Sequence, residues 1–177
     1  MPEFLSIEAM RGVVTHAISE FARHDMALLH VKVQEETLAH RVAVYIERRL
    51  QGWQVDCEYN RNLRHAKMRA DGNSRMRPDI IAHIRNSPRN LLVVEIKKAT
   101  HSKKNKTEAG ERVREFTGKW TTHPRYCHGV ILIFPVREND PKQVACSWFH
   151  RNGCGQYTGG EPSTFSENIS LENGGVA

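Results

Sequence analysis

The sequence lacks the features that would place the chain in a membrane or on a secretory pathway. It contains no apolar run of about 18 residues or more, so we expect no membrane-spanning helix. The opening residues, MPEFLSIEAMRG, do not combine a basic region with an apolar core, so we expect no signal peptide. Cysteine is scarce, with 4 residues among 177, and no internal repeat is evident. We therefore expect a cytoplasmic protein with reduced thiols.

The length and charge of the chain fit one domain with a polyanionic partner. A chain of 177 residues can form one domain with appendages. We expect a single domain over residues 1–156, followed by a loosely ordered tail over residues 157–177, which contain no lysine or arginine. Lysine and arginine number 26 against 20 acidic residues, giving a net charge of +6. An excess of basic over acidic residues of this size favours nucleic acid as a partner without establishing it.

The most informative stretch is residues 77–97, RPDIIAHIRNSPRNLLVVEIK, which predicts a β-hairpin. Two runs rich in branched aliphatic residues flank the turn-forming cluster at residues 86–90. Folding the chain about this turn brings Asp79 opposite Glu95 and Lys97. We therefore expect two carboxylates and an ammonium group within cross-strand distance, about 5 Å.

The two faces of this hairpin should differ in character, because successive side chains of a strand point to opposite sides. Glu95 and Lys97 share one face, which we expect to be exposed to solvent. On that basis, replacing either residue with alanine should leave the fold largely intact. The opposite face should be dry and is formed by Ile80, Ala82, Ile84, Leu92, Val94 and Ile96.

Two adjacent carboxylates repel each other unless a positive charge lies between them. A divalent metal ion is a natural candidate, and hard oxygen ligands suit Mg²⁺ or Mn²⁺. Lys97 could then orient a water molecule or neutralise a phosphate. The alternative is a surface hairpin that carries an ordinary cross-strand pair between Asp79 and Lys97.

The residues Pro78-Asp79 and Glu95-Ile96-Lys97 resemble the motif of the PD-(D/E)xK nuclease superfamily. The resemblance covers roughly residues 34–136 and implies a restriction-endonuclease-like α/β fold with a metal-dependent endonuclease activity, most simply on DNA. It implies that Asp79, Glu95 and the backbone carbonyl of Ile96 bind Mg²⁺ or Mn²⁺, and that Lys97 holds or helps deprotonate the attacking water.

A helix expected at residues 34–51 carries the remaining catalytic candidate. Its buried stripe includes Leu38 and Val42, and Glu35 falls near the middle of that stripe. Many members of the superfamily have a metal-binding glutamate on the helix before the sheet, which favours Glu35, with Glu36 as the alternate. The other interpretation is that both are ordinary first-turn acids favoured by the helix dipole.

The remaining pattern completes an αβββαβ order around a central mixed sheet of about four strands flanked by helices. We expect an added N-terminal helix at residues 6–30, started by Ser6, and a first strand at residues 53–59. A helix at residues 107–122, with Thr107 as its N-cap, precedes a buried central strand at residues 128–136. Residues 144–150 could add an edge strand.

Two basic segments, residues 61–77 and 97–106, flank the proposed carboxylate site. We expect a turn or loop at residues 71–74 of the first segment and a loop over the second. Positive charge beside a metal site suits a phosphodiester backbone, although charge runs are often merely solvated. Glu58 could reach the metal site, but we expect it to pair with a neighbouring arginine. Arg112 and Lys119 could contact DNA, but we expect them to lie on a solvated helix face. The candidates for nucleic-acid contact are Arg61, Arg64, Lys67, Arg69, Arg75, Arg77, Lys98, Lys103 and Lys104.

Two other functions remain open from the sequence. The same fold could bind nucleic acid without cleaving it, or it could serve as a protein-interaction module whose basic face meets an acidic partner. A homodimer is compatible with each of these. No residue in the carboxylate–lysine set reads a base, so no sequence specificity is expected from this set.

Overall fold

A computed structural model describes residues 1–31, 33–59, 61–62, 65–66, 77–118, 125–137, 140, 142–151 and 162–172, with backbone alone at 61–62 and 65–66. The described part of the chain is an α/β fold with a six-stranded sheet in the order β1-β4-β5-β6-β7-β8 and a separate two-stranded sheet of β2 and β3. The strands are β1 (Gln54–Cys57), β2 (Arg61–Asn62), β3 (His65–Ala66), β4 (Ile80–His83), β5 (Asn90–Lys98), β6 (Tyr126–Phe134), β7 (Gln143–His150) and β8 (Ser163–Ser170).

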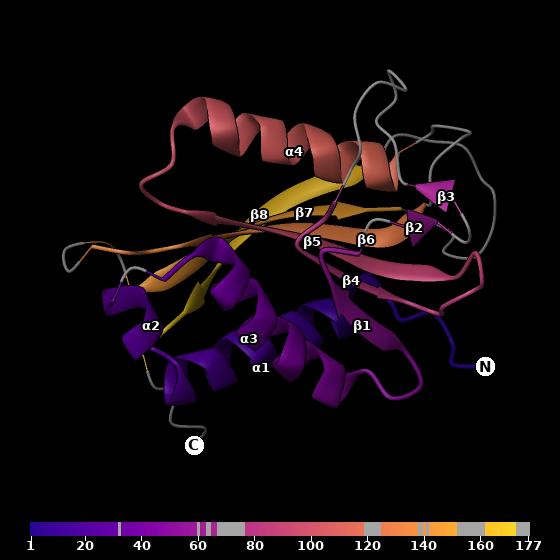
Figure 1. Cartoon of the computed structure of the whole chain (residues 1–177), viewed down its shortest axis with the longest axis horizontal. Coiled ribbons are helices and arrows are strands. Elements are labelled where there is room, and N and C mark those ends of the chain that lie inside the picture. The colour runs from indigo at the N-terminus through magenta and orange to yellow at the C-terminus, as the bar shows by residue number, and fades with distance from the viewer. Residues whose placement is uncertain are drawn as a thin grey trace.

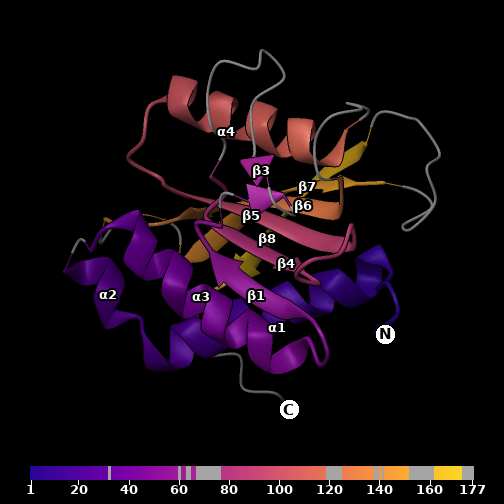
Figure 2. The same ribbon diagram turned by 45° about the vertical axis from the view of Figure 1, so that its right-hand side comes forward.

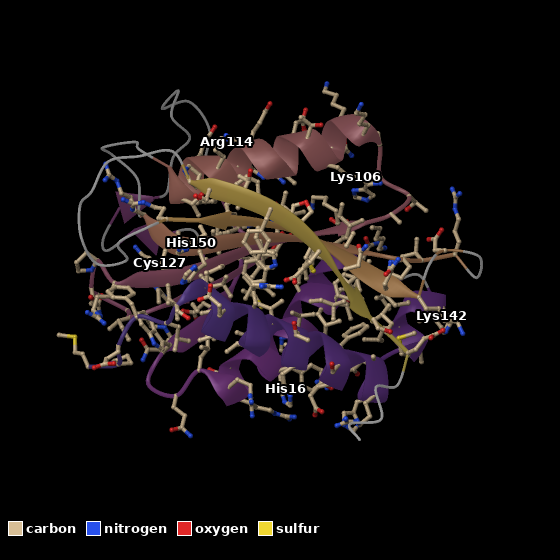
Figure 3. The ribbon with its side chains drawn as sticks, turned by 180° about the vertical axis from the view of Figure 1, so that it is seen from behind. His16, Lys106, Arg114, Cys127, Lys142 and His150 are labelled. Atoms are coloured by element: carbon tan, nitrogen blue, oxygen red, sulfur yellow. The ribbon has the colours of Figure 1, made fainter. Side chains whose placement is uncertain are left out.

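Helices cover both faces of the six-stranded sheet (Figures 1 and 2). Helices α1 (Ile7–His24), α2 (Ala27–His30) and α3 (Glu35–Arg49) lie on one side, and α4 (Lys103–Thr117) lies on the other. Figure 3 shows Lys106 and Arg114 on α4, with His16 of α1 on the far side of the sheet. No helix of the described ranges is long and apolar enough to cross a membrane.

The sheet is mixed because α4 connects two parallel strands. Strands β5 and β6 run parallel, with Val93 beside Gly129 and Glu95 beside Ile131, whereas the other neighbours in the sheet are antiparallel. A parallel pair needs a long crossover, and α4 supplies it. This arrangement buries β5 and β6 on both faces, as their continuous apolar sequences predict.

Close approach of α4 to the sheet depends on Gly129 in β6. A methyl group at this position would lie 2.4 Å from Cγ1 of Val113 and 2.9 Å from Cγ2 of Thr117, both on α4. Real side chains do not tolerate such distances, so the absence of a side chain at Gly129 allows the helix to pack directly against β6.

The sequence-based expectations for the helices are confirmed in outline and corrected at their ends. The helix at residues 34–51 is α3, and Ser6 caps α1 by accepting a hydrogen bond from the backbone N–H of Ala9. The single helix at residues 6–30 is wrong, because α1 ends at His24 and the short α2 follows.

The helix predicted at residues 107–122 begins four residues earlier, at Lys103, with Ser102 as its N-cap in place of Thr107. Residues 119–122 lie outside the described ranges. The loop expected at residues 97–106 is also wrong in large part. Lys97 and Lys98 complete β5, and residues 103–106 form the first turn of α4.

The α/β class and the mixed sheet are confirmed, but the expected number of strands is wrong. The two additional strands are β7 and β8, so residues 144–150 are not at the sheet edge. The loosely ordered tail is wrong for residues 163–170, which pair with β7 along its whole length. Phe165 stacks on Trp148, and Glu167 accepts a hydrogen bond from the Trp148 indole at 2.7 Å.

Candidate active site

The register of β4 and β5 brings together the three motif residues, as the hairpin prediction requires. Ile80 pairs with Val94, so Asp79, directly before β4, comes level with Glu95. One carboxylate oxygen of Asp79, Oδ2, accepts a hydrogen bond from the backbone N–H of Ile96 at 2.6 Å. The same oxygen lies 3.9 Å from Nζ of Lys97.

The prediction that one face of the hairpin is dry is confirmed, and the prediction that the other face is exposed to solvent is wrong. The first face packs against α1 and α3 through Ile80, Ala82, Leu92, Val94 and Ile96, with Ile84 partly buried beside them. The second face lies under α4, where Ile81, Val93, Val113 and Phe116 form a second apolar cluster. Glu95 is consequently buried beside Arg112 of α4, whereas Lys97 is buried near the end of β5 against Glu35 of α3. Alanine at either position would strip a buried charged group of its partner, so we no longer expect such variants to keep the fold intact.

Lys97 lies between oxygen atoms that come from different parts of the chain. Its ammonium donates to the backbone carbonyl of Ile96 and, over 2.9 Å, to Oε2 of Glu35. Only 10% of the Lys97 side chain is exposed to solvent. A buried ammonium is stable only with such partners, so these oxygens hold Lys97 in place.

Glu35, the first residue of α3, points into this cluster, and Glu36 is exposed on the helix surface. Besides Lys97, Glu35 accepts a hydrogen bond from the backbone N–H of Lys98 at 3.0 Å. Its Oε1 also lies 3.4 Å from Nε2 of His101, a residue that the sequence interpretation did not select. Of the two glutamates considered, Glu35 is thus the one that the fold brings to the motif residues.

Arg112 of α4 is a second residue that sequence reasoning placed wrongly. Its guanidinium donates to Oε2 of Glu95 at 2.6 Å, and its side chain is only 26% exposed, so it does not lie on a solvated helix face. Although burial disfavours the charged form, the hydrogen bond and charge of Glu95 raise the pKa of Arg112. The available signal is the helical spacing of α4, because Arg112 lies three residues after Ala109 and four before Phe116, at the edge of the buried stripe.

The carboxylates of this cluster carry more negative charge than their partners neutralise. Burial, and then repulsion from Glu95, raise the pKa of Asp79 to about 7, against the opposing effect of Lys97. The other oxygen of Glu95, Oε1, is buried without a hydrogen-bond partner. A buried, unsatisfied carboxylate oxygen is costly, and an elevated carboxyl pKa marks a site that would gain from a further cation.

The donor atoms fit a hard divalent cation in kind, but they are not gathered around one point. Within the described ranges, no group of three or more His, Cys, Asp or Glu side chains is arranged to hold a metal ion. Both oxygens of Glu35 contact Lys97, Lys98 or His101, and one oxygen of Glu95 contacts Arg112. Oε1 of Glu95 has no hydrogen-bond partner, so it is the Glu95 oxygen that could act as a ligand.

The candidates for nucleic-acid contact fall into two groups. Arg77 is exposed and lies 3.1 Å from Glu58, which confirms the expected pairing of Glu58 with an arginine. Lys98 donates to the backbone carbonyl of Val33, while Lys103 and Lys104 are exposed on the first turn of α4. The side chain of Arg61, and all of Arg64, Lys67, Arg69 and Arg75, lie outside what the structure describes.

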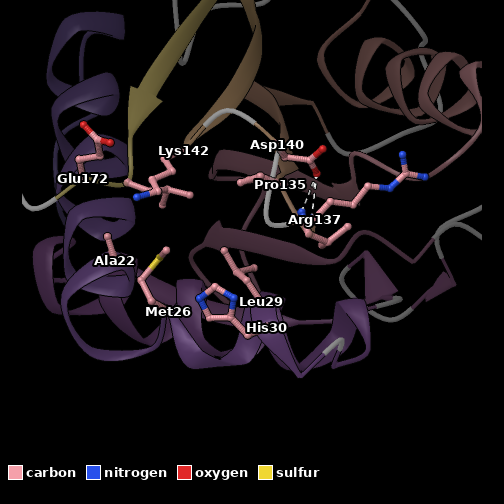
Figure 4. A pocket seen from close by; sticks show the side chains of 11 residues that line it. Ala22, Met26, Leu29, His30, Pro135, Arg137, Asp140, Lys142 and Glu172 are labelled. Atoms are coloured by element: carbon pink, nitrogen blue, oxygen red, sulfur yellow. Dashed lines mark hydrogen bonds between the residues drawn. The ribbon is translucent and has the colours of Figure 1, made fainter.

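A separate hollow of about 520 Å³ lies where α1 and α2 meet the ends of β6 and β8 (Figure 4). Met26, Leu29 and Pro135 contribute apolar surface to it, and His30 and Lys142 add polar groups. None of the carboxylate-cluster residues lines it, so it is distinct from the candidate active site.

Comparison with known proteins produced no match: no protein-family model, no curated protein and no solved structure is similar to this chain at a significant level. The function therefore has to be argued from the geometry of the site.

Proposed function

We propose that this protein is a metal-dependent endonuclease with a restriction-endonuclease-like core of the PD-(D/E)xK type. The observation that carries the proposal is the placement of the motif residues at the junction of β4 and β5, where Asp79 lies level with Glu95 and 3.9 Å from Lys97, and Glu35 of α3 contacts Lys97. Apart from the separate β2–β3 pair, the elements follow one another as α3, β1, β4, β5, α4 and β6. This order supports the proposal, because it is the αβββαβ order that the motif implies.

The residues of the cluster divide into metal ligands and groups that act on substrate or water. Asp79, Glu95 and the carbonyl of Ile96 would hold Mg²⁺ or Mn²⁺, and Glu35 would complete or tune the coordination. When bound, the metal would lower the pKa of a bound water and stabilise negative charge on the phosphate. As an ammonium Lys97 would hold the attacking water, and as a neutral amine it would help deprotonate that water.

The groups around this cluster would orient its members and the substrate. Arg112 would hold Glu95 through Oε2, leaving Oε1 for the metal. The exposed cations Arg77, Lys103 and Lys104 would bind backbone phosphates, which are the same in every sequence. We propose that the substrate is DNA in the cytoplasm. Asp79, Glu95 and Lys97 would act on its backbone without recognising the bases.

One observation favours a second candidate function. The absence of a convergent metal-binding group in the described ranges suits a domain that keeps the fold and the basic surface but binds nucleic acid without cleaving it. Such a module would bind DNA in a salt-dependent way, and its binding would survive replacement of Asp79.

A cleavage assay separates the two functions. Supercoiled, linear duplex, single-stranded and four-way-junction DNA, and RNA, would each be incubated with the full chain and Mg²⁺, Mn²⁺ or EDTA. We expect cleavage of DNA with metal only, and its loss in Glu95→Gln, which removes one charge but retains the size of the side chain. Binding without cleavage in both proteins would reject the nuclease in favour of the binding module. If the protein neither binds nor cleaves any of these nucleic acids, both functions are rejected and the protein-interaction module is left.

A further inference from the structure

The Lys97 ammonium contacts the same oxygens that the proposed metal ion would need. It donates to the carbonyl of Ile96 and to Glu35, and lies 3.9 Å from Oδ2 of Asp79. Each of these three residues is a proposed metal ligand, and each belongs to a different segment: the end of β5, the start of α3 and the residue before β4. One positive group thus occupies the centre of a set of hard oxygen donors.

The charges of the cluster show why a second cation would compete with this lysine. Glu35, Asp79 and Glu95 contribute three negative charges when ionised, and Lys97 and Arg112 contribute two positive charges. The cluster thus carries one net negative charge, and a divalent cation would reverse it to one net positive charge. Burial weakens solvent screening, so a metal ion and the ammonium would repel each other strongly if both contacted the same oxygens.

We propose that Lys97 is a resident cation that a divalent metal ion must displace from Glu35 and Ile96 before it can bind. The inference rests on the proposed function, because it assumes that these oxygens bind metal. In the metal-free protein the ammonium keeps the carboxylates together. Metal binding then frees the ammonium for water or phosphate, so the catalytic lysine becomes available only when the metal is in place.

This exchange predicts that removing the ammonium strengthens metal binding even though it removes a catalytic group. A hydrogen bond to a charged group shifts an equilibrium constant by about tenfold or more. Lys97→Met keeps an unbranched side chain of similar length without the charge, and we expect it to bind Mn²⁺ about tenfold more tightly than the wild-type protein. Lys97→Gln, a shorter and polar replacement, should show the same direction if the methionine variant does not fold.

Lys98→Met is the matched control. It removes the same charge from the next residue of β5, but the Lys98 ammonium donates to the carbonyl of Val33 and not to the carboxylate cluster. Its affinity for Mn²⁺ should stay within about twofold of the wild-type value, because the Lys98 ammonium is held by Val33 and occupies none of the proposed ligand oxygens.

The test is calorimetric titration of the full-length wild type and these variants, together with Asp79→Asn, using Mn²⁺ alone, after circular dichroism has confirmed folding. Tighter binding by Lys97→Met or Lys97→Gln, unchanged binding by Lys98→Met and loss of binding by Asp79→Asn would support the exchange. Unchanged or weaker binding by both Lys97 variants, with binding still dependent on Asp79, would overturn the exchange and leave the proposed metal site standing. No Mn²⁺ binding by any of these proteins would overturn both.

Discussion

Replacing Arg112 with methionine should destabilise the protein strongly, because it leaves the carboxylate of Glu95 buried without its cation. The Glu95 side chain is 2% exposed, and its Oε2 lies 2.6 Å from the Arg112 guanidinium. Methionine fills much of the space that the arginine stem occupies, so the principal loss is electrostatic rather than a cavity.

The size of the loss follows from the geometry of the pair. Two unit charges with centres about 4 Å apart at an effective dielectric constant of about 20 attract each other by about 4 kcal/mol. Because 26% of the Arg112 side chain is exposed, part of this attraction is screened. We therefore expect Arg112→Met to lower the free energy of unfolding by about 3 kcal/mol, in the range measured when one partner of a buried ion pair is removed.

Urea unfolding followed by tryptophan fluorescence would measure this loss, and a double-mutant cycle would assign it to the pair. In Glu95→Gln/Arg112→Met the orphaned charge is gone, so at least half of the lost stability should return. Arg114→Met is the control, since Arg114 lies two residues away on the exposed side of α4. A loss below about 1 kcal/mol in Arg112→Met, or no recovery in the double variant, would refute the assignment of Arg112 as the partner that stabilises buried Glu95.

Three further predictions follow from the geometry of the fold and site. The pKa of Asp79 is raised from 3.8 to about 7 in the folded state. The folded protein therefore binds more protons than the unfolded chain between about pH 4 and 7, and the free energy of unfolding should fall as pH rises through this window. Urea unfolding at pH 5 and pH 8 should show this fall in the wild type and a much smaller one in Asp79→Asn; equal falls would contradict the elevated pKa. Gly129→Ala should cost about 1–3 kcal/mol by thermal unfolding, because the new methyl group would overlap α4, whereas Gly12→Ala, with no atom within 4 Å of the new methyl group, should be neutral or stabilising. Glu35→Gln should lower the free energy of unfolding by about 1–2 kcal/mol, because the neutral amide binds Lys97 more weakly. The exposed Glu36→Gln should stay within about 0.5 kcal/mol of the wild-type value, and equal effects of the two changes would show that Glu35 is an ordinary first-turn acid.

The hairpin illustrates what the sequence alone could predict. Turn residues between two apolar runs defined its register closely enough to place Asp79 beside Glu95 and Lys97, and this juxtaposition is confirmed. Strand registers are predictable when a short turn and a clear apolar alternation agree. The sequence alone leaves Glu35 and Glu36 as candidates for the carboxylate on α3, because helical periodicity locates the buried face of a helix only to within about one residue.

The burial of Glu95 and Lys97 could not be predicted from that alternation. Polar residues spaced two apart on a strand normally indicate a solvated face, but here α4 crosses this face and supplies Arg112 as a partner for Glu95, while Glu35 at the start of α3 is the partner of Lys97. The identity of that partner depends on how the crossover helix packs on the sheet, which is set by long-range features such as the missing side chain at Gly129.

Strand β8 shows a different limit. Its sequence, STFSENIS, is polar, and the strand is exposed for most of its length, so neither composition nor apolar alternation indicates a strand. It forms because β7 offers a pairing edge, and Phe165 and Glu167 find a partner in Trp148. Such tertiary effects override weak local preference in many β-strands.

Metal-dependent nicking of supercoiled DNA is the most direct test of the central claim that the cluster around Asp79 is a nuclease site. The assay would compare the wild-type protein with Asp79→Asn and with Asp140→Asn, a matched change at an aspartate that lines the hollow of Figure 4 and contacts no residue of the cluster within the described ranges. We predict nicking by the wild type and Asp140→Asn only with Mg²⁺ or Mn²⁺, and none by Asp79→Asn. Nicking that persists in Asp79→Asn, or its absence in the folded wild-type protein with either metal, would contradict the account.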